Sequence, residues 1–224
     1  MNKLNHVAFI MDGNGRWGIK KNQSRNFGHL HGVQTVQKIV RESINLKIPV
    51  ITFYVFSTEN WKRPKSEINY LFRLINLYFL KELKNIIKNN IRINIVGKKT
   101  NLPKIIINRL NEVTKKTKNN KKIIVNLAIN YGSKSEIIYA CKKVLKKKEI
   151  VSEKNIQKYL YINSPNPDIL IRTGGKKRLS NFLLWQIAYT ELYFLDKLWP
   201  DFNKKDLIKI INNYKKIKRN YGGI

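Results

Sequence analysis

The sequence predicts an α/β protein in which a mainly parallel, six-stranded sheet is flanked by helices. Short apolar runs alternate along the chain with longer segments whose apolar residues recur at helical spacing. Polar, glycine-bearing stretches follow several of the short runs, as expected where strands end. Strands that alternate with helices need crossover connections, and these produce a mainly parallel sheet.

The expected elements follow from the spacing of apolar residues. Strands are expected at 6–11, 50–56, 91–96, 122–129, 168–172 and 191–195. Helices are expected at 29–47, 65–88, 102–117, 133–147, 153–161 and 203–219. The first helix carries one apolar stripe and ends before Pro49, whereas the helix at 65–88 is apolar over more than one face. That second pattern is compatible with plain core packing or with the wall of an apolar tunnel.

Nothing in the chain suggests a division into domains. No repeat or low-complexity linker interrupts the alternation, so residues 1–224 are expected to form a single domain. A hydrophobic content of 42% is enough for a sizeable core. The one cysteine, Cys141, excludes an internal disulfide and is expected to be a small buried residue in a reducing compartment.

The net charge of +31 allows three interpretations. A nucleic-acid-binding protein needs such a field, but aromatic residues that could stack on bases do not interleave with the basic runs. Attraction to anionic membranes or substrates is a second interpretation. The third is compositional drift, since lysine and asparagine together crowd the surface-like stretches, such as 115–122.

Targeting and membrane-spanning segments are not expected. No apolar run is long enough to cross a bilayer, and only the first five residues precede His6. These features predict a cytoplasmic protein, with peripheral contact at the inner face of a membrane as a further possibility.

Three polar stretches are expected to converge on one edge of the sheet. They are DGNGRW after the first strand, STENWKRP (57–64) after the second, and RTGGKKRLS (172–180) after the fifth. Ligands of parallel sheets bind beyond the carboxyl ends of the strands, so these stretches are candidate binding loops.

The first loop has the composition of an anion site that includes a metal ion. Gly13 and Gly15 permit unusual backbone angles, and Arg16 with Arg25 and His29 adds positive charge. A tight turn with a surface arginine is the alternative. Asp12 would repel a diphosphate unless Mg²⁺ bridges the two, which predicts a magnesium site. Glu191 is a candidate second ligand or a solvated strand end.

The other two loops complete this candidate site. In the RTGG loop, Arg172 and Arg178 can fork onto phosphate oxygens and Ser180 offers a hydroxyl. The pattern matches neither a nucleotide-binding nor a dinucleotide-binding loop, so ATP and NAD are not indicated. In the second loop, Asn60 is a candidate for orienting a proton or a water, and the alternative is a capping role for Ser57 or Asn60.

Together these stretches resemble the cis-prenyltransferase family, in particular its bacterial undecaprenyl diphosphate synthases. The resemblance rests on HVAFIMDGNGRWG, RNFGHLHG, TFYVFSTENWKRP, ILIRTGG, RLSNFLLWQIAYTELYFLDKLWPDF and the closing RNYGG. It spans nearly the whole chain. It implies a homodimeric enzyme that adds isopentenyl diphosphate to farnesyl diphosphate, forming each new double bond in the cis configuration. The expected product is undecaprenyl diphosphate, the lipid carrier precursor of cell-wall glycan synthesis.

The resemblance also assigns roles to individual residues. Asp12 and Glu191 would bind Mg²⁺, and Asp12 and Asn60 would be catalytic. The diphosphates and the reacting chain would be held by Gly13, Asn14, Gly15, Arg16, Trp17, Arg25, His29, Ser57, Thr58, Glu59, Trp61, Arg63, Arg172, Arg178, Leu179 and Ser180. Helix 65–88 and strand 50–56 would wall an apolar tunnel, which Val55 would narrow.

One departure from the family pattern concerns the RTGG loop. Many bacterial relatives carry a histidine where this chain has Lys177, which puts any contribution of that position to the metal site in doubt. The alternatives are a relative with a different product length, a catalytically silent partner subunit, and a basic nucleic-acid-binding protein. A trans-type prenyl synthase is disfavoured because the chain has no adjacent aspartates.

Overall fold

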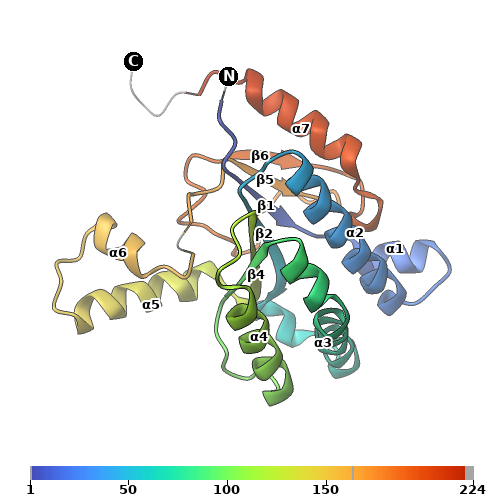
Figure 1. Ribbon diagram of the computed structural model, residues 1–224, viewed down its shortest axis with the longest axis horizontal. Coiled ribbons are helices and arrows are strands. Elements are labelled where there is room, and N and C mark those ends of the chain that lie inside the picture. Colours follow the sequence, from blue (N-terminus) through green and yellow to red (C-terminus); the bar gives the residue numbers. More distant parts are fainter. Residues whose placement is uncertain (1, 163, 220–224) are drawn as a thin grey trace.

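The computed structural model describes residues 2–162 and 164–219, and its centre is one six-stranded sheet (Figure 1). The strands are β1 (His6–Ile10), β2 (Val50–Ser57), β3 (Ile91–Val96), β4 (Ile123–Tyr131), β5 (Ile169–Arg172) and β6 (Glu191–Phe194). They lie in the order β3-β4-β2-β1-β5-β6, and each neighbouring pair is parallel. The predicted fold class is therefore confirmed, with a sheet that is parallel throughout the described chain.

Seven α-helices and two short 3₁₀ helices occupy the described residues between the strands and after the last of them. They are α1 (Asn14–Lys20), α2 (Arg25–Asn45), η1 (Thr58–Lys62), α3 (Lys65–Lys88), α4 (Lys104–Thr117), α5 (Ser133–Lys146), α6 (Glu153–Tyr159), η2 (Trp199–Asp201) and α7 (Lys204–Lys216). The helix expected at 29–47 begins earlier than predicted, because Ser24 caps it by accepting a hydrogen bond from the Phe27 amide at 3.1 Å.

The first glycine-rich loop contains a helix that the sequence pattern did not predict. α1 begins at Asn14, so Gly15 lies inside a helix and only Gly13, with φ of 109°, uses a left-handed conformation. α1 is held by close packing on α2. A Cβ atom on Gly28 would lie 1.9 Å from the Asn14 carbonyl oxygen, so this contact requires glycine.

The two faces of the sheet are covered differently. Alternate residues of β1 point to opposite sides, with Phe9 in the larger core and Ala8 in a smaller one. The larger core packs against α2, α3, α4 and α7. The smaller core is covered by the segment 179–187, which is largely irregular. Helices on both faces were expected, but here an irregular segment with buried Phe182 and Leu183 replaces a helical layer.

Helices α5 and α6 extend away from the sheet as an arm (Figure 1). They have a small core of their own, formed by Ala140, Val144, Ile156 and Leu160. Across residues 2–162 and 164–219, none of the helices combines the length and the apolar composition needed to cross a membrane.

The register brings three strand ends to the same edge of the sheet. Ile10 pairs with Tyr54 on one side and with Arg172 on the other. The loops that follow β1, β2 and β5 therefore leave the sheet at one edge, as predicted from the order of the elements.

Candidate active site

Asp12 and Arg172 meet where β1 and β5 end. One carboxylate oxygen of Asp12 accepts a hydrogen bond from Arg172 at 3.0 Å, and the other accepts from Arg16 at 3.1 Å. The main chain of Asp12 is fixed as well, because its carbonyl accepts from the Trp199 amide and from the Thr173 hydroxyl. Asp12 and Arg172 are 160 residues apart in the sequence, and the parallel pairing of β1 with β5 brings them together.

Arg172 also organises the loop that follows β5. Its guanidinium donates to the Ser180 hydroxyl at 2.7 Å and to the Arg178 carbonyl. Arg172 is buried, whereas Arg178 and Ser180 are exposed. Gly174, with φ of 90°, turns this loop and offers its carbonyl to Arg16 at 2.8 Å. The first and third predicted loops are thus joined by direct hydrogen bonds.

A second cation cluster forms around Glu67, a residue that lies outside the three predicted loops. Its carboxylate accepts from Arg25 at 3.0 Å, from His29 at 3.1 Å and from Arg63 at 3.1 Å. The side chain of Glu67 is 8% exposed, so this is a buried counter-charge. The i,i+4 spacing of Arg63 and Glu67 was a weak signal in the sequence. The pairing with α2 appears only in the fold.

The surroundings of Glu67 shift two pKa values. Burial alone would raise the pKa of Glu67, but hydrogen bonds from Arg25 and His29 and the charge of Arg63 outweigh it and lower that pKa to about 2. Burial lowers the pKa of His29, although the hydrogen bond to Glu67 opposes the change. The cluster therefore contains an ionised carboxylate at neutral pH.

Asn60 lies on η1 and caps it. The Ser57 amide donates to the side-chain oxygen of Asn60 at 3.1 Å, and the side chain of Ser57 completes a capping box. Because an N–H group can donate only to the amide oxygen, this bond fixes the orientation of the Asn60 side chain. Its NH₂ group is then the end available to a ligand, and that group is a hydrogen-bond donor.

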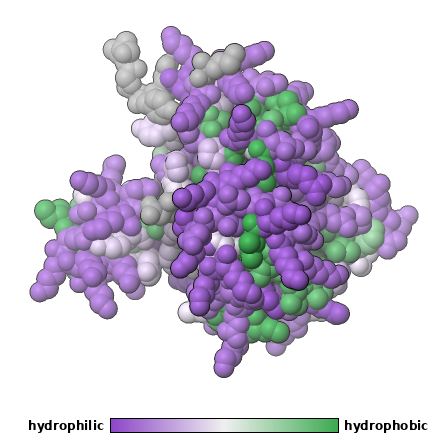
Figure 2. All heavy atoms as spheres, viewed as in Figure 1, coloured by the Kyte–Doolittle hydropathy of each residue, from purple (hydrophilic) through white to green (hydrophobic). Residues whose placement is uncertain are grey.

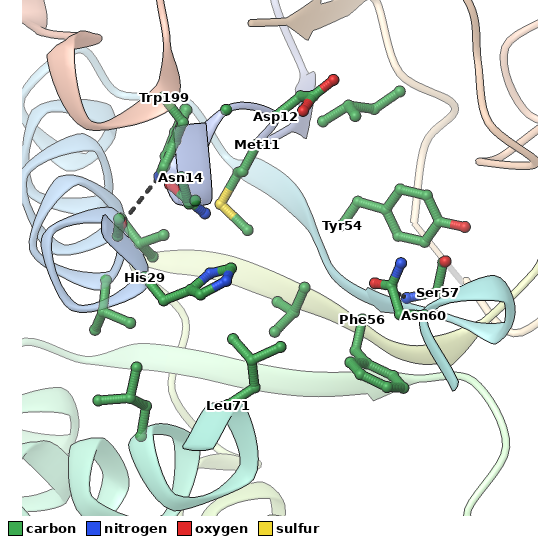
Figure 3. Close-up of a pocket in the computed structure, with 18 of the residues that line it drawn as sticks. Met11, Asp12, Asn14, His29, Tyr54, Phe56, Ser57, Asn60, Leu71 and Trp199 are labelled. Carbon is green, nitrogen blue, oxygen red and sulfur yellow. Dashed lines mark hydrogen bonds between the residues drawn. The ribbon is translucent and has the colours of Figure 1, made fainter. Parts of the chain in front are cut away.

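A cavity of about 550 Å³ connects these groups to the interior. Its rim is polar and contains the predicted residues Asp12, Gly13, Asn14, Gly15, Arg16, Arg25, His29, Ser57, Asn60, Arg63, Arg172, Arg178 and Ser180. Its inner wall is apolar and comes mainly from β2, β4, α2 and α3, through residues that include Val33, Val36, Val55, Leu71, Leu74, Ile75, Tyr78, Phe79, Leu127 and Ile129. In Figure 3, Met11, His29 and Leu71 point toward the middle of the cavity.

Five predicted binding residues do not line this cavity. They are Trp17, Thr58, Glu59, Trp61 and Leu179. Trp17 stacks on Phe27 and donates to Asp201 at 2.7 Å, while Trp61 packs on Phe56 and donates to Asn130 at 2.8 Å. Glu59 accepts from Asn181 at 2.8 Å. Leu179 packs against the smaller core.

The structure does not bring Glu191 to Asp12 within the chain. Glu191 begins β6 and pairs with Ile169, whereas Arg172, beside Asp12, pairs with Phe194. Three residues of strand separate the two positions, about 10 Å along the sheet. Parallel pairing puts the first residue of β6 at the amino end, so Glu191 faces the opposite edge, 4.0 Å from Arg219.

The donor set at Asp12 is compatible with magnesium brought by a substrate. No group of three or more histidine, cysteine, aspartate or glutamate side chains that could hold a metal ion occurs in residues 2–162 and 164–219. Mg²⁺ needs no such cage, because it is commonly held by one or two carboxylates together with substrate phosphates and water. Asp12 lines the cavity with a side chain that is 29% exposed, so its carboxylate is accessible.

Known proteins match this chain along its length. It matches the family described as "Putative undecaprenyl diphosphate synthase" over residues 10–222. It is 46% identical to an isoprenyl transferase of Fusobacterium nucleatum, with 98% of this chain and 96% of the relative covered. It is also 46% identical to an isoprenyl transferase of Rickettsia bellii, with 99% of each chain covered.

Two solved structures share the fold. The crystal structure of lavandulyl diphosphate synthase from Lavandula x intermedia, in complex with dimethylallyl diphosphate, superposes with a TM-score of 0.93 at 30% identity over 98% of both chains. A "probable undecaprenyl diphosphate synthase" from Campylobacter jejuni superposes with a TM-score of 0.86 at 37% identity over the whole of both chains.

A parallel sheet with a cation-rimmed, apolar cavity at its carboxyl edge, together with these matches, defines a class of enzyme, the cis-type isoprenyl transferases. Within that class, the chain belongs to the undecaprenyl diphosphate synthase family.

Proposed function

We propose that this enzyme condenses isopentenyl diphosphate repeatedly with an allylic diphosphate, with farnesyl diphosphate as the starter. Each new double bond is cis, and the product is a long-chain polyprenyl diphosphate. We propose undecaprenyl diphosphate, the precursor of the lipid carrier for cell-wall glycan synthesis. A product of another length is the alternative, since an identity of 46% to relatives does not fix chain length.

The main support for this proposal is the distribution of charged and apolar residues around the cavity. Its rim bears Arg16, Arg25, Arg63, Arg172 and Arg178, and its interior is apolar. A diphosphate ester with a hydrocarbon tail has the same division between a charged end and an apolar end. Each CH₂ group buried in such an interior contributes about 0.8 kcal/mol, so a growing chain is favoured inside it.

The two cation clusters suggest how two diphosphates are held. Arg25, His29 and Arg63 would bind the allylic diphosphate near the first loop. Arg172, Arg178 and Ser180 would bind isopentenyl diphosphate. Both clusters border one cavity, so the allylic carbon of one substrate and the alkene of the other can meet between them.

Asp12 would hold Mg²⁺ together with the oxygens of the allylic diphosphate. When bound, Mg²⁺ neutralises the negative charge that grows on the diphosphate as its bond to carbon breaks. Arg16, which is hydrogen-bonded to Asp12, would stabilise the same charge.

Asn60 would orient isopentenyl diphosphate during the loss of its proton. The alkene forms a new carbon–carbon bond with the allylic carbon, and a proton then leaves the condensing unit. The Asn60 NH₂ group donates and cannot accept that proton, so a diphosphate oxygen is the acceptor we favour.

The assembly and surroundings of the enzyme are part of this proposal. We propose a homodimer, as the family resemblance implies, with transient membrane contact for product release. The arm of α5 and α6 exposes apolar residues, including Ile138, Leu145 and Ile150, that a second subunit can cover. Analytical ultracentrifugation tests the dimer.

Incubation with Mg²⁺, farnesyl diphosphate and labelled isopentenyl diphosphate tests the reaction. Chromatography of the dephosphorylated lipid should show a ladder that ends at a long polyprenol. Formation of no lipid product would contradict the proposed activity, whereas a product of another length would correct only the proposed chain length. Salt-sensitive RNA or DNA binding that diphosphate does not compete away would favour the nucleic-acid interpretation instead.

A further inference from the structure

Helix α3 lies between the cavity and the outside of the molecule. Its inward and outward faces carry different residues. Its inward residues, Leu71, Leu74, Ile75, Tyr78 and Phe79, line the cavity. Its outward face carries Leu77, Leu80 and Ile87, whose exposed fractions are 39%, 52% and 40%. At 100° per residue, these three side chains fall within one third of the helix circumference.

The exposed charged residues of α3 are all positive. The exposed cations of α3 are Lys65, Arg73, Lys81, Lys84 and Lys88. The structure describes the whole of α3, and none of the exposed side chains on this helix is acidic. Glu67 is buried and Glu82 is half-buried. We call the three apolar and five cationic residues together the α3 outer face.

Figure 2 shows patches of hydrophobic surface, bordered by hydrophilic atoms, over the part of the molecule where α3 and α4 lie. A helix with exposed leucines among lysines matches the composition of helices that lie in the interface of a bilayer.

We propose that the α3 outer face docks on a bilayer that contains anionic lipids. The proposal rests on the proposed function, because a long polyprenyl product needs an apolar phase to enter. The helix that touches the bilayer would be the same helix that walls the cavity. Docking would therefore bring the product and the lipid to opposite sides of one helix.

The positive charge of the α3 outer face favours an anionic bilayer as its partner over a second copy of the chain. A symmetric dimer through α3 would place the cationic faces of the two copies against each other. Five positive charges from each copy would then oppose one another, whereas anionic headgroups would neutralise them. Each lysine near an anionic surface strengthens binding by about fivefold.

Flotation of the whole purified protein with vesicles tests the docking surface without any substrate. The probes are phosphatidylglycerol–phosphatidylcholine vesicles and pure phosphatidylcholine vesicles. Wild type should float with the anionic vesicles, and added salt should weaken the binding. The double variant Lys81→Gln/Lys84→Gln should bind about 25-fold more weakly. Leu80→Gln should weaken binding at high salt, where the apolar contribution dominates.

Matched controls separate the α3 outer face from overall charge. Lys205→Gln/Lys209→Gln removes two exposed lysines from α7, and Leu46→Gln removes an apolar residue that is 36% exposed. These variants should bind like wild type. An equal loss in the α3 and α7 variants would overturn the proposal in favour of a diffuse charge effect. Equal binding of wild type and the α3 variants would overturn it as well.

Two further measurements distinguish this inference from the proposed function. Condensation in a single turnover without vesicles should be the same in wild type and in Lys81→Gln/Lys84→Gln, because neither lysine lines the cavity. Steady-state turnover should rise with anionic vesicles in wild type and much less in the variant. Condensation without vesicle binding would overturn the docking surface alone, whereas vesicle binding without condensation would contradict only the proposed reaction. Concentration-dependent self-association of wild type that the α3 variants abolish would overturn the lipid as occupant.

Discussion

Asp12 and Arg172 lie 160 residues apart in the chain, yet a carboxylate oxygen of the first is 3.0 Å from the guanidinium of the second. The pair joins the ends of β1 and β5 at the rim of the cavity. It places the one carboxylate that we assign to magnesium beside the arginine that we assign to isopentenyl diphosphate. The geometry of this pair underlies the first prediction.

Asp12→Asn should retain the fold and lose most of the activity. The amide keeps the shape and can accept from Arg172, but it lacks the negative charge that attracts Mg²⁺. We expect turnover to fall by at least about a hundredfold. Steady-state assays over a range of Mg²⁺ concentrations measure this. Glu153→Gln, at an exposed carboxylate of α6, is the control and should leave the magnesium dependence unchanged.

Asn60→Asp separates capping from catalysis. The Asp carboxylate can accept from the Ser57 amide and keep the cap, but it cannot donate to a substrate. Melting temperature should stay within a few degrees of wild type while turnover falls by about a hundredfold. Asn60→Ala should lose turnover and also about 1 kcal/mol of stability. If Asn60→Asp were fully active, Asn60 would be a capping residue without a role in the reaction.

Glu67 should act as a positioning residue for the allylic diphosphate. In Glu67→Gln, Arg25, Arg63 and His29 lose the negative charge that they share, and hydrogen bonds to charged groups contribute about 1.5–3 kcal/mol each. We expect KM for farnesyl diphosphate to rise about tenfold or more, with a much smaller change in kcat. KM for isopentenyl diphosphate should stay near the wild-type value.

Glu82→Gln is the matched control on the same helix, since Glu82 bonds Asn85 and does not line the cavity. Glu67→Ala should also lower the free energy of unfolding by about 1 kcal/mol, because His29 loses its acceptor while Arg25 and Arg63 remain partly open to water. A fall in kcat alone, with both KM values unchanged, would contradict the positioning role of Glu67.

Product length should respond to the volume of residue 55. Val55 lines the cavity from β2, so Val55→Phe fills space that the growing chain needs. The expected product is shorter, and Val55→Ala should give an equal or longer one. Chromatography of the dephosphorylated lipids measures both. Val151→Phe, at an exposed position, should not change the product. An unchanged product from Val55→Phe would place the end of the growing chain elsewhere.

His6 should make the protein less stable in mild acid. It is fully buried, its Nδ1 donates to the Pro165 carbonyl, its Nε2 accepts from the Thr52 hydroxyl, and burial lowers its pKa from 6.5 to about 4. At pH values between about 4 and 6.5, His6 therefore binds a proton in the unfolded chain but not in the folded chain. Stability falls as pH decreases through this window, by up to about 3 kcal/mol. Urea unfolding at several pH values measures the slope, and His6→Gln should make it shallower.

The order of the elements was predictable from sequence because it depends on local spacing. The run 50–56 is short and rich in β-branched residues, and the segment 65–88 is long and periodic. The type of each element could therefore be predicted from its own residues alone. The short helices α1 and η1 were missed, since seven and five residues carry too little periodic pattern. Their glycine, serine and asparagine residues are equally typical of turns.

What the sequence by itself determined was the edge at which the site forms. Polar loops that follow parallel strands must leave the sheet together, so Asp12, Asn60 and Arg172 were predictable neighbours of one cavity. Only the tertiary structure decided which side chains face that cavity. Glu67 meets Arg25 through the packing of α3 beside α2, and Glu191 falls at the far edge through the register of β6. Helix rotation and strand register set these directions, and both depend on contacts between residues that are distant in the chain.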